Sequence, residues 1–544
     1  MIKKILFLFL FVGNYTLSQN TVGTISVTNE AYDGFTIFSI HQKTYLIDNC
    51  GRVIHEWTSA YPPGNAVYLL PNGNLLRASR NDGESQISFG GRGGVIELFD
   101  WDGNLIWQYE YNTDDYRQHH DVYPMPSGNV LILAATVMTQ AEAIQAGRDP
   151  SLLDDNELYN ERIFEVGPVG ANQANVVWEW NIKDHLVQNF DNTKDNFGSI
   201  ASNPGKLNIN FLNGSGAGAN WLHINSIQYY ETFDQIVISS RNLSEIWIID
   251  HSTTTAEAAS GSGGNYGKGG DFLYRWGNPQ SYDHGNESDR KLYGQHYPHF
   301  IESGLVDAGK IILFNNGNDR IPAFSEVFIL DTPMTSPGVY TYSTLTPYGP
   351  INPDYIYADP TNNPSDFYSP IVSSAQRLPN GNILVCQGSS GRFFELNASD
   401  QIVWEYINPI RNDNGVIANQ TESISANTTF RAIKYTRTYG AFTGRDVTPG
   451  LPIEGNPDLT PCNTLSVDEV VIDEIKIYPN PASDKITVAT SRAVDKIEIY
   501  TLLGKKINEV LYTNEADLSK IKSGLYLIKI YADNTVITKK IIKE

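Results

Sequence analysis

Short runs of alternating hydrophobic and polar residues recur along most of this chain, separated by turns rich in proline, glycine and asparagine. The segments NAVYLLPNGNLL, HDVYPMPSGNVLIL and SSAQRLPNGNILV each place an alternating run on both sides of a turn of the form Pro-x-Gly-Asn. Alternation of this kind around a tight turn is typical of a β-hairpin. We therefore predict a series of paired strands.

A second pattern consists of strands that end in aromatic residues, and it allows the repeating units to be counted. Many of these strands follow a shorter strand and a turn, as in VIELFDWDGNLIWQY, which predicts another hairpin. Each unit then contains two inner and two outer strands, and four-stranded units repeated around an axis form a β-propeller. We predict an all-β fold with six blades, from the segments VIHEW, LIWQY, VVWEW, FLYRW, VYTYS and IVWEY, which end at Trp57, Tyr109, Trp180, Trp276, near Tyr342 and at Tyr406.

The spacing of the units exceeds that of a minimal blade, so long loops must be inserted between the strands. The first outer pair, which ends at Trp57, precedes any inner pair. We expect residues 425–445 to supply its missing inner strands, because this pairing would close the ring and cover its edges. The predicted insertions are residues 138–160, 184–220, 252–271 and 344–372.

The two ends of the chain differ in character from the repeats. Lys3 and Lys4 precede a short apolar run, which is typical of a secretory signal peptide at residues 1–18. A linker rich in proline and glycine follows the repeats, and short alternating strands after it predict a small β-sandwich. The expected domains are a propeller at 19–445, a linker at 446–466 and a sandwich at 467–544.

Composition restricts the partners that this chain can have. The net charge is -22, which argues against nucleic-acid binding because a phosphate backbone would be repelled. No segment after the signal peptide is long and apolar enough for a transmembrane helix. We expect an exported protein that is secreted or attached to the cell surface. Its three cysteines, Cys50, Cys386 and Cys462, allow at most one disulfide.

Three histidines occupy the same position at the start of a predicted inner strand. These are His120, His223 and His296, whereas Asn65 and Ser373 hold that position in two further repeats. Equivalent positions of inner strands in a propeller face the central channel. The histidines are therefore predicted to converge on one spot and to carry any chemistry.

The segment after the linker resembles the C-terminal sorting domains of the type IX secretion system of Bacteroidetes. The motifs that carry the resemblance are IYPNPASDKITV, the turn at residues 502–505, SGLYLIKI and the basic end of the chain. The resemblance implies that the type IX machinery is a partner in export. It implies nothing about catalysis.

The repeats resemble the arylsulfotransferase family over nearly all of residues 30–440. Matching stretches include HHDVYPMPSGNVLIL, WLHINSIQYY, SSRNLSEIWIIDHSTTTAEAA, LYRWGNPQSY and GQHYPHFI. The family implies six blades and transfer of a sulfuryl group from an aryl sulfate to a phenol through a sulfohistidine, without a nucleotide sulfate donor. By motif, His296 corresponds to the nucleophile, and the other catalytic or substrate-binding positions are His120, His223, Arg241, Asn225 and His119.

No cofactor or metal follows from this resemblance, and the expected small-molecule partners are an aryl sulfate and a phenolic acceptor. The chain lacks the closely spaced cysteine pair that characterised relatives carry near the site. Two other classes of function remain open. A propeller without turnover could bind sulfated glycans or phenolics, and a hydrolase or lyase could use the same channel residues. Three further histidines, His185, His251 and His299, are interpreted as structural.

Overall fold

A computed structural model describes residues 20–463, apart from 84, 215, 344 and 359–362, and residues 476–544, apart from 491–492, 502–504 and 533–534. The predicted signal peptide, the end of the predicted linker and residues 502–504 of the sorting motif lie outside the described residues. The chain divides into two units, with the boundary between Cys462 and Asn463. Each unit is described by itself.

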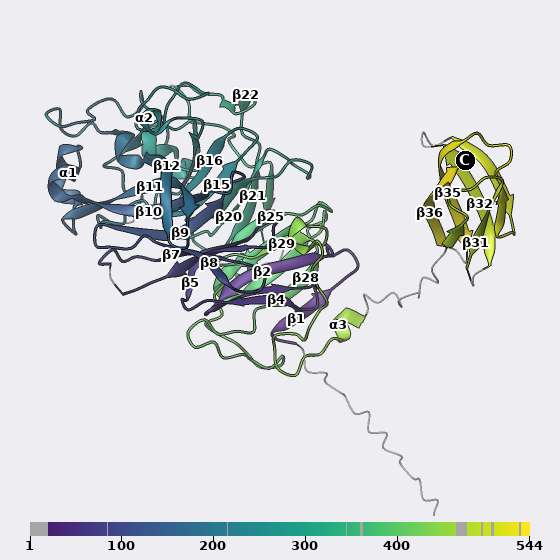
Figure 1. The fold of residues 1–544 in the computed structure, drawn as a ribbon. Helices are drawn as coiled ribbons and strands as arrows, with labels where there is room; N and C mark the ends of the chain where they lie inside the picture. Colours follow the sequence, from purple (N-terminus) through teal and green to yellow (C-terminus); the bar gives the residue numbers. More distant parts are fainter. Residues whose placement is uncertain are drawn as a thin grey trace, which may run out of the picture. The chain divides into compact units, whose positions relative to one another are not determined.

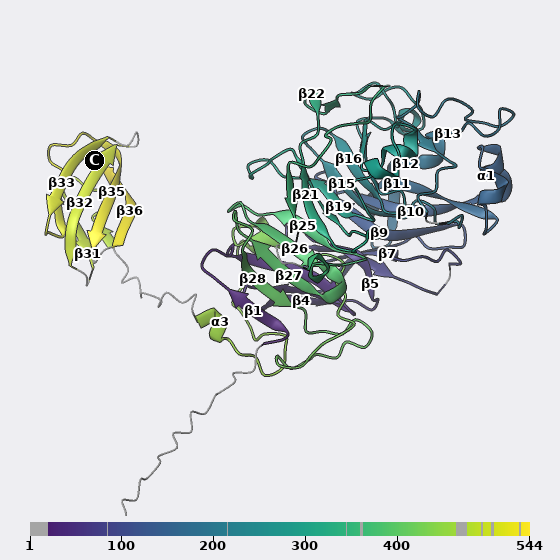
Figure 2. The same ribbon diagram turned by 180° about the vertical axis from the view of Figure 1, so that it is seen from behind.

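The first unit is built mainly from antiparallel sheets that follow one another in a ring (Figure 1, Figure 2). Six of these sheets form the blades, so the predicted six-bladed all-β propeller is confirmed. The first three blades, from the innermost strand outward, are β29 (Ile433–Thr436), β2 (Gly34–Ile40), β3 (Lys43–Ile47) and β4 (Val53–Thr58); β5 (Pro63–Leu69), β6 (Leu75–Arg80), β7 (Gly94–Phe99) and β8 (Leu105–Glu110); and β9 (Tyr116–Pro124), β10 (Val130–Thr139), β11 (Glu157–Val169) and β12 (Gln173–Asn181).

The other three blades follow the same order of strands. They are β15 (Ile224–Tyr230), β16 (Gln235–Ser240), β17 (Glu245–Asp250) and β18 (Tyr274–Trp276); β19 (His296–Phe300), β20 (Ile311–Asn315), β21 (Glu326–Leu330) and β24 (Tyr355–Tyr357); and β25 (Ser374–Arg377), β26 (Ile383–Gln387), β27 (Arg392–Leu396) and β28 (Ile402–Ile407). The insertions between strands carry α1 (Gln140–Gln145), α2 (Thr255–Ala258) and the short strands β13 (Leu186–Val187) and β14 (Leu207–Asn208).

The ring is closed at two places by strands distant in sequence. Strand β29 forms the innermost strand of the first blade by pairing with β2, and β1 (Gly23–Val27) adds a fifth strand to the last blade by pairing with β28. Residues 425–445 therefore supply one inner strand of the first blade. The second inner strand is β2, which directly precedes the outer pair β3 and β4. Both pairings cover backbone edges that would otherwise be open.

One of the predicted outer strands is wrong. The segment VYTYS does not join the fifth blade, because β23 (Val339–Tyr340) pairs with β22 (Met334–Ser336) in a separate hairpin. The fourth strand of that blade is β24, which pairs with β21 from within the predicted loop 344–372. VYTYS has the aromatic composition of the other outer strands, but its backbone forms its hydrogen bonds with β22, which is closer in the sequence.

Residues that were expected to form the first part of the linker are attached to the first blade. The backbone N–H of Gly450 donates to the carbonyl of Val53 at 2.8 Å. Cys462, in α3 (Thr460–Asn463), forms a disulfide with Cys50 across a sequence separation of 412 residues. Cys386 is buried in β26 as a free thiol. The chain is thus tied to the propeller as far as Cys462.

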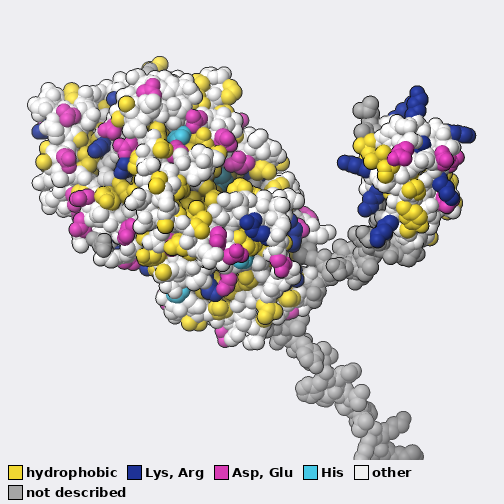
Figure 3. Space-filling view, viewed as in Figure 1, with side chains coloured by type: hydrophobic (Ala, Val, Ile, Leu, Met, Phe, Trp, Pro, Cys, Tyr) yellow, Lys and Arg dark blue, Asp and Glu magenta, His cyan; other side chains and the backbone are white. Residues whose placement is uncertain are grey.

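The second unit consists of two antiparallel sheets around a core of isoleucine, valine and alanine side chains. Lysine side chains stand out from the face of this unit seen in Figure 3. Among the described residues of both units, no helix is long and apolar enough to cross a membrane. The two sheets are β30 (Lys476–Tyr478), β31 (Lys485–Ala489) and β34 (Glu515–Asp517), and β33 (Lys506–Leu511), β32 (Val494–Thr501), β35 (Gly524–Ala532) and β36 (Thr535–Lys543).

Candidate active site

The repeated position at the start of the inner strands has an unusual backbone. Four residues there have a positive φ: Asn65 (96°), His120 (50°), His223 (47°) and Ser373 (94°). In the fifth blade, the residue with a positive φ is Tyr297 (51°), which follows His296. Non-glycine residues rarely adopt this conformation, and it clusters at functional sites. The position is therefore specialised in its backbone as well as its side chains.

Each of the three histidines also lies at a break in the strand register. The pairing of β9 with β10 shifts around His120, that of β15 with β16 shifts just after His223, and that of β19 with β20 shifts after His296. Such β-bulges change the direction of a side chain, and they occur often next to active sites. The bulges turn the imidazoles toward the channel at one end of the inner strands.

The imidazole rings gather in one cluster. The ring centroids of His120 and His223 are 4.8 Å apart. The ring of Phe430 lies 6.4 Å from that of His120 and 6.5 Å from that of His296. The structure thus brings together the three histidines of the repeat.

His296 is held through one ring nitrogen by a residue of the neighbouring strand end. Its Nδ1 lies 2.7 Å from Oδ1 of Asn316. The Asn316 amide nitrogen donates to the carbonyls of Ser369 at 2.7 Å and Val372 at 3.0 Å, so Oδ1 must be the acceptor. Nδ1 of His296 therefore carries the proton, and Nε2 has a free lone pair.

His120 is connected to a buried carboxylate through its neighbour in the sequence. Nδ1 of His120 lies 2.9 Å from Nδ1 of His119, and Nε2 of His119 lies 2.8 Å from Oε2 of Glu161. A carboxylate only accepts, so His119 donates from Nε2 and its Nδ1 accepts from His120. The three side chains form a continuous path for a proton.

His223 has the opposite tautomer to His296. The side-chain amide of Asn220 donates to Nδ1 of His223 at 2.7 Å, which places the ring proton on Nε2. Glu161 supports this residue as well, because its Oε1 accepts from the backbone N–H of Ile224 at 3.1 Å. His223 can therefore donate a hydrogen bond into the cluster.

Arg241 provides a positive charge beside the histidines. Its side chain is half-buried, and within the described part of the chain it donates hydrogen bonds to Oδ1 of Asn242 at 3.3 Å and to the carbonyl of Pro370 at 3.5 Å. No carboxylate of the described residues forms an ion pair with it, whereas the buried Arg77 and Arg275 are each paired with a glutamate. An unpaired guanidinium in such a place is suited to an anionic ligand.

The environment keeps all three imidazoles neutral. Burial is the main cause that lowers the pKa of each ring, and the charge of Arg241 acts in the same direction. The pKa of His296 falls to about 3, and those of His120 and His223 fall well below their usual value. Neutral rings next to a cation can act as nucleophile, hydrogen-bond donor and proton acceptor.

Two predicted substrate-binding residues lie behind the cluster. His119 is fully buried between His120 and Glu161. Asn225 is also fully buried, and its amide nitrogen donates at 2.8 Å to the carbonyl of Gln295, next to His296. Both side chains are placed to hold neighbouring residues in position.

Sequence reasoning missed the loop between β6 and β7, which covers the histidines. The ring of Phe89 lies 4.8 Å from His119 and 6.0 Å from His223. A Cβ atom at Gly91 would lie 2.0 Å from Nε2 of His120, and Gly91 has a φ of +80°. The only signal in the sequence was the unusual run FGGRGG.

A buried ion pair separates the histidine end of the channel from the remainder. Arg431 binds Oδ2 of Asp121 at 2.8 Å and the hydroxyl of Tyr68 at 2.5 Å, and its guanidinium lies 3.6 Å from the ring centroid of Tyr297. Asp121 and Arg431 are both buried. We refer to Tyr68, Asp121, Tyr297 and Arg431 as the channel partition.

Comparison with known proteins agrees with the division into two units. A family model described as arylsulfotransferase matches residues 19–434, and a model of secretion system C-terminal sorting domains matches residues 476–544. A curated ulvan lyase of Nonlabens ulvanivorans is 36% identical over 86 residues, which cover 14% of this chain and 16% of the lyase. The match therefore spans a small part of that relative's length.

Solved structures resemble the chain only distantly. A protein of unknown function from Bacteroides caccae has a TM-score of 0.38 and 9% identity, and the match covers 74% of this chain and 98% of that one. A periplasmic gluconolactonase of Pseudomonas aeruginosa has a TM-score of 0.35 and 11% identity, with 74% and 99% covered. These similarities are too weak to bear on activity.

Proposed function

Because this chain belongs to the arylsulfotransferase family, we propose that it moves a sulfuryl group from an aryl sulfate to a phenol through a covalent intermediate on His296. Membership of the family makes the protein a transferase. Its C-terminal sorting domain makes it a secreted or cell-surface protein. The identity of the nucleophile and the substrate classes are the parts that we propose.

The observation that carries the proposal is the tautomer of His296. Asn316 holds the proton on Nδ1, so the lone pair of Nε2 is available for attack. Because the pKa of this ring is about 3, the lone pair stays unprotonated at neutral pH. In the first step, Nε2 forms a bond to sulfur while the bond from sulfur to the aryl oxygen breaks. The electron pair of that bond leaves with the phenolate.

Arg241 and His223 are assigned to the sulfuryl oxygens. The negative charge of a transferred sulfuryl group is spread over its oxygens, as in phosphoryl transfer. An unpaired guanidinium and the Nε2–H of His223 are fixed donors for such charge. Asn225 is assigned a supporting role, because it binds the backbone beside His296.

The departing phenolate needs a proton, and we assign its delivery to Nε2 of His120. Burial and neighbouring positive groups disfavour an imidazolium at His120 itself. The extra proton that this delivery requires is shared along the hydrogen-bonded path of His120, His119 and Glu161. Transfer from Nδ1 of His119 to Nδ1 of His120 would accompany loss of the proton at Nε2. In the second step the acceptor oxygen forms a bond to sulfur, and the bond from sulfur to Nε2 of His296 breaks with its electron pair returning to that nitrogen. The same path runs backward and accepts the proton of the phenolic acceptor.

The test separates covalent transfer from binding and hydrolysis. Purified protein is incubated with a chromogenic aryl sulfate, with and without added phenol, and phenolate release is followed. Without acceptor, we expect phenolate release to stop after a single turnover and the peptide containing His296 to carry a sulfuryl group; with acceptor, we expect release to continue. His296→Asn should show neither.

Three outcomes would contradict the proposal. Wild-type turnover in His296→Asn would exclude this residue as the nucleophile. Continued release in the absence of a phenol would indicate hydrolysis, and binding of the aryl sulfate without release would indicate a binding protein. Folding of the variant is checked by its thermal unfolding.

A further inference from the structure

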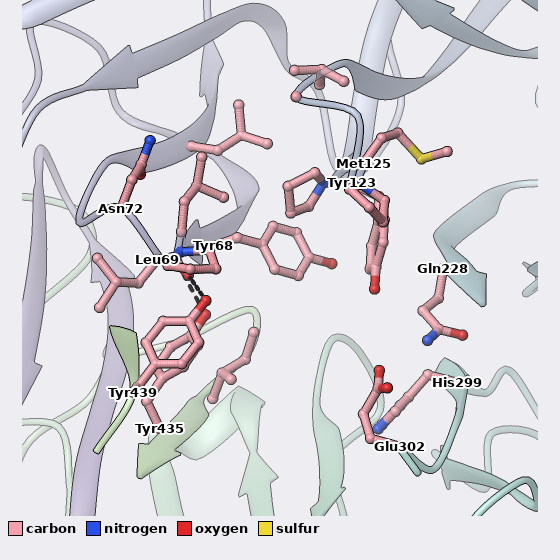
Figure 4. Close-up of a pocket in the computed structure, with 18 of the residues that line it drawn as sticks. Tyr68, Leu69, Asn72, Tyr123, Met125, Gln228, His299, Glu302, Tyr435 and Tyr439 are labelled. Atoms are coloured by element: carbon pink, nitrogen blue, oxygen red, sulfur yellow. Dashed lines mark hydrogen bonds between the residues drawn. The ribbon is translucent and has the colours of Figure 1, made fainter. Parts of the chain in front are cut away.

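A cavity lies beyond the channel partition, at the end of the channel away from the histidines. Tyr68, Tyr123 and His299 each follow the repeated position of their inner strand by three residues, and all three line this cavity. Its volume is about 690 Å³ (Figure 4). The ion pair of Arg431 and Asp121 stands between it and the histidine cluster. A ligand here would not contact the transfer site.

Most of the cavity wall is apolar or aromatic. The hydroxyl of Tyr439 donates to the carbonyl of Leu69 at 2.9 Å, and that of Tyr435 accepts from the Leu69 N–H at 3.0 Å (Figure 4). These two tyrosines thus use their hydroxyls within the protein and leave their rings for contact with a ligand. Aliphatic side chains add to the wall, among them Leu70, Met125, Ile301 and Ile433.

Three polar side chains of the cavity stand together on the other side. Figure 4 shows Gln228, His299 and Glu302 across the space from Tyr435 and Tyr439. Nδ1 of His299 donates to the carbonyl of Tyr297 at 3.1 Å, and burial lowers the pKa of this ring to about 4. The ring is therefore neutral, with a lone pair on Nε2. The Glu302 carboxylate is a second acceptor.

The charges around the cavity disfavour an anion. Arg377 is the one cationic residue among the described lining residues, and it is engaged by Asp307 at 2.5 Å and by the carbonyl of Gly381 at 2.7 Å. Glu302 would repel a sulfate ester, whereas the hydroxyl of a neutral phenol could donate to it or to His299. Flat aromatic surfaces suit the tyrosine rings.

We propose that this cavity is a binding site for an uncharged hydroxyl-bearing aromatic compound, separate from the transfer site, and that it discriminates against the sulfate ester of the same compound. Its recognition elements are the rings of Tyr435 and Tyr439 and the acceptors His299 and Glu302. The inference goes beyond the proposed transfer reaction, because it requires no turnover.

Binding is measured directly on the full chain with three probes, without a second substrate. These are 2-naphthol, 2-naphthyl sulfate and naphthalene. Leu70→Trp places a large ring at a partly buried position of the wall, and it should weaken 2-naphthol binding at this cavity by roughly tenfold or more. Gly91→Ala disturbs the histidine end of the channel, and it should leave the affinity of the cavity for 2-naphthol unchanged.

A second variant tests the polar contact. His299→Phe keeps a ring but removes the acceptor, so it should weaken 2-naphthol roughly three- to tenfold and change naphthalene binding less than about twofold. Equal affinity of wild type and a folded Leu70→Trp for 2-naphthol would overturn the proposal. So would equal affinity of the cavity for 2-naphthol and 2-naphthyl sulfate. If Leu70→Trp does not fold, the affinities of His299→Phe for 2-naphthol and naphthalene decide. Equal losses of affinity for the two probes, or no loss for either, would then overturn the proposal. Because no turnover is measured, failure of the transfer reaction would leave this result unaffected.

Discussion

Asn316 accepts a hydrogen bond from Nδ1 of His296 across 2.7 Å and leaves Nε2 of the same ring without a proton. The acceptor is defined because both hydrogens of the Asn316 amide are used by backbone carbonyls. This contact links the fold of the fifth blade to the reactivity of one nitrogen atom.

Asn316→Ala should therefore slow formation of the covalent intermediate. Without the acceptor, His296 can turn or exchange tautomers, and a histidine held in the wrong tautomer costs up to roughly 10⁴-fold in rate. We expect a loss of about 10²- to 10⁴-fold in the single-turnover rate, with a smaller change in substrate affinity. The matched control is Asn318→Ala, two residues along, whose amide donates to the carbonyl of Pro370 and not to the ring. Equal losses in the two variants would contradict the assignment.

The loop over the histidines offers a paired test with two neighbouring glycines. Gly91→Ala would place a Cβ 2.0 Å from Nε2 of His120 and would strain a positive φ, so we expect transfer to fall by at least about tenfold. At Gly90 the added Cβ would lie 3.4 Å from the nearest atom of His223, and Gly90→Ala should be nearly neutral. The measurement is kcat/KM with an aryl sulfate and a phenol. The reverse order of effects would show that His120 is not constrained by this loop.

Glu161→Gln tests the proton path. Nε2 of His119 donates to this carboxylate, so replacing the carboxylate by an amide should interrupt the hydrogen-bonded path that reaches His120. Since the leaving phenolate takes its proton from this path, we expect the transfer rate to fall. The loss should be greatest for aryl sulfates with poor leaving groups. An equal loss for good and poor leaving groups would indicate a structural role only.

His251 should make the stability of the propeller depend on pH. Burial opposes its charge, but hydrogen bonds to Asp234 at 2.8 Å and Glu165 at 3.0 Å outweigh this and raise its pKa to about 9. A raised pKa stabilises the fold at pH values below that of the unfolded histidine, about 6.5, and the contribution is lost as pH rises toward 9. We expect wild type to lose about 1–3 kcal/mol of unfolding free energy over this range, relative to His251→Gln. Parallel curves for the two proteins in urea titrations at each pH would contradict this.

The boundary between the units can be tested by truncation. A chain that ends after Asn463 keeps the disulfide between Cys462 and Cys50, and we expect it to unfold like the intact propeller and to remain active. A chain that ends at residue 446 loses this bond and the contacts near Val53, and its unfolding free energy should fall by about 2–4 kcal/mol. Thermal unfolding compares the two. Neither should be exported, because both lack the sorting domain.

The repeat in the sequence was sufficient to predict the propeller and the equivalent positions of His120, His223 and His296. Alternation and turn residues are local signals, and each blade carries them separately. The contacts that define tautomers were not predictable in this way. Asn316, Asn220 and Glu161 reach the histidines from other strands or from loops, at distances that depend on the β-bulges. The register of a bulged strand is set by packing across blades, and a single sequence does not reveal it.

The outer strand of the fifth blade and the predicted linker illustrate the same limit. VYTYS has the composition of its counterparts, but the competition between β22 and the blade for this segment is decided in three dimensions. Similarly, the proline-rich residues after β29 read as a linker, although the disulfide at Cys462 attaches them to the first blade. Composition describes what a segment can do alone and omits the partners that fix it.

The disulfide between Cys50 and Cys462 also determines where tension enters the propeller. A pull on the C-terminal unit reaches the ring at this covalent bond and passes directly to the turn between β3 and β4. Strand β29 and the segment that follows it lie outside this direct route of the force. The hydrogen bonds of β29 therefore carry little of it. The disulfide thus protects the pairing of β29 with β2, which closes the ring, from a force applied to the C-terminal unit.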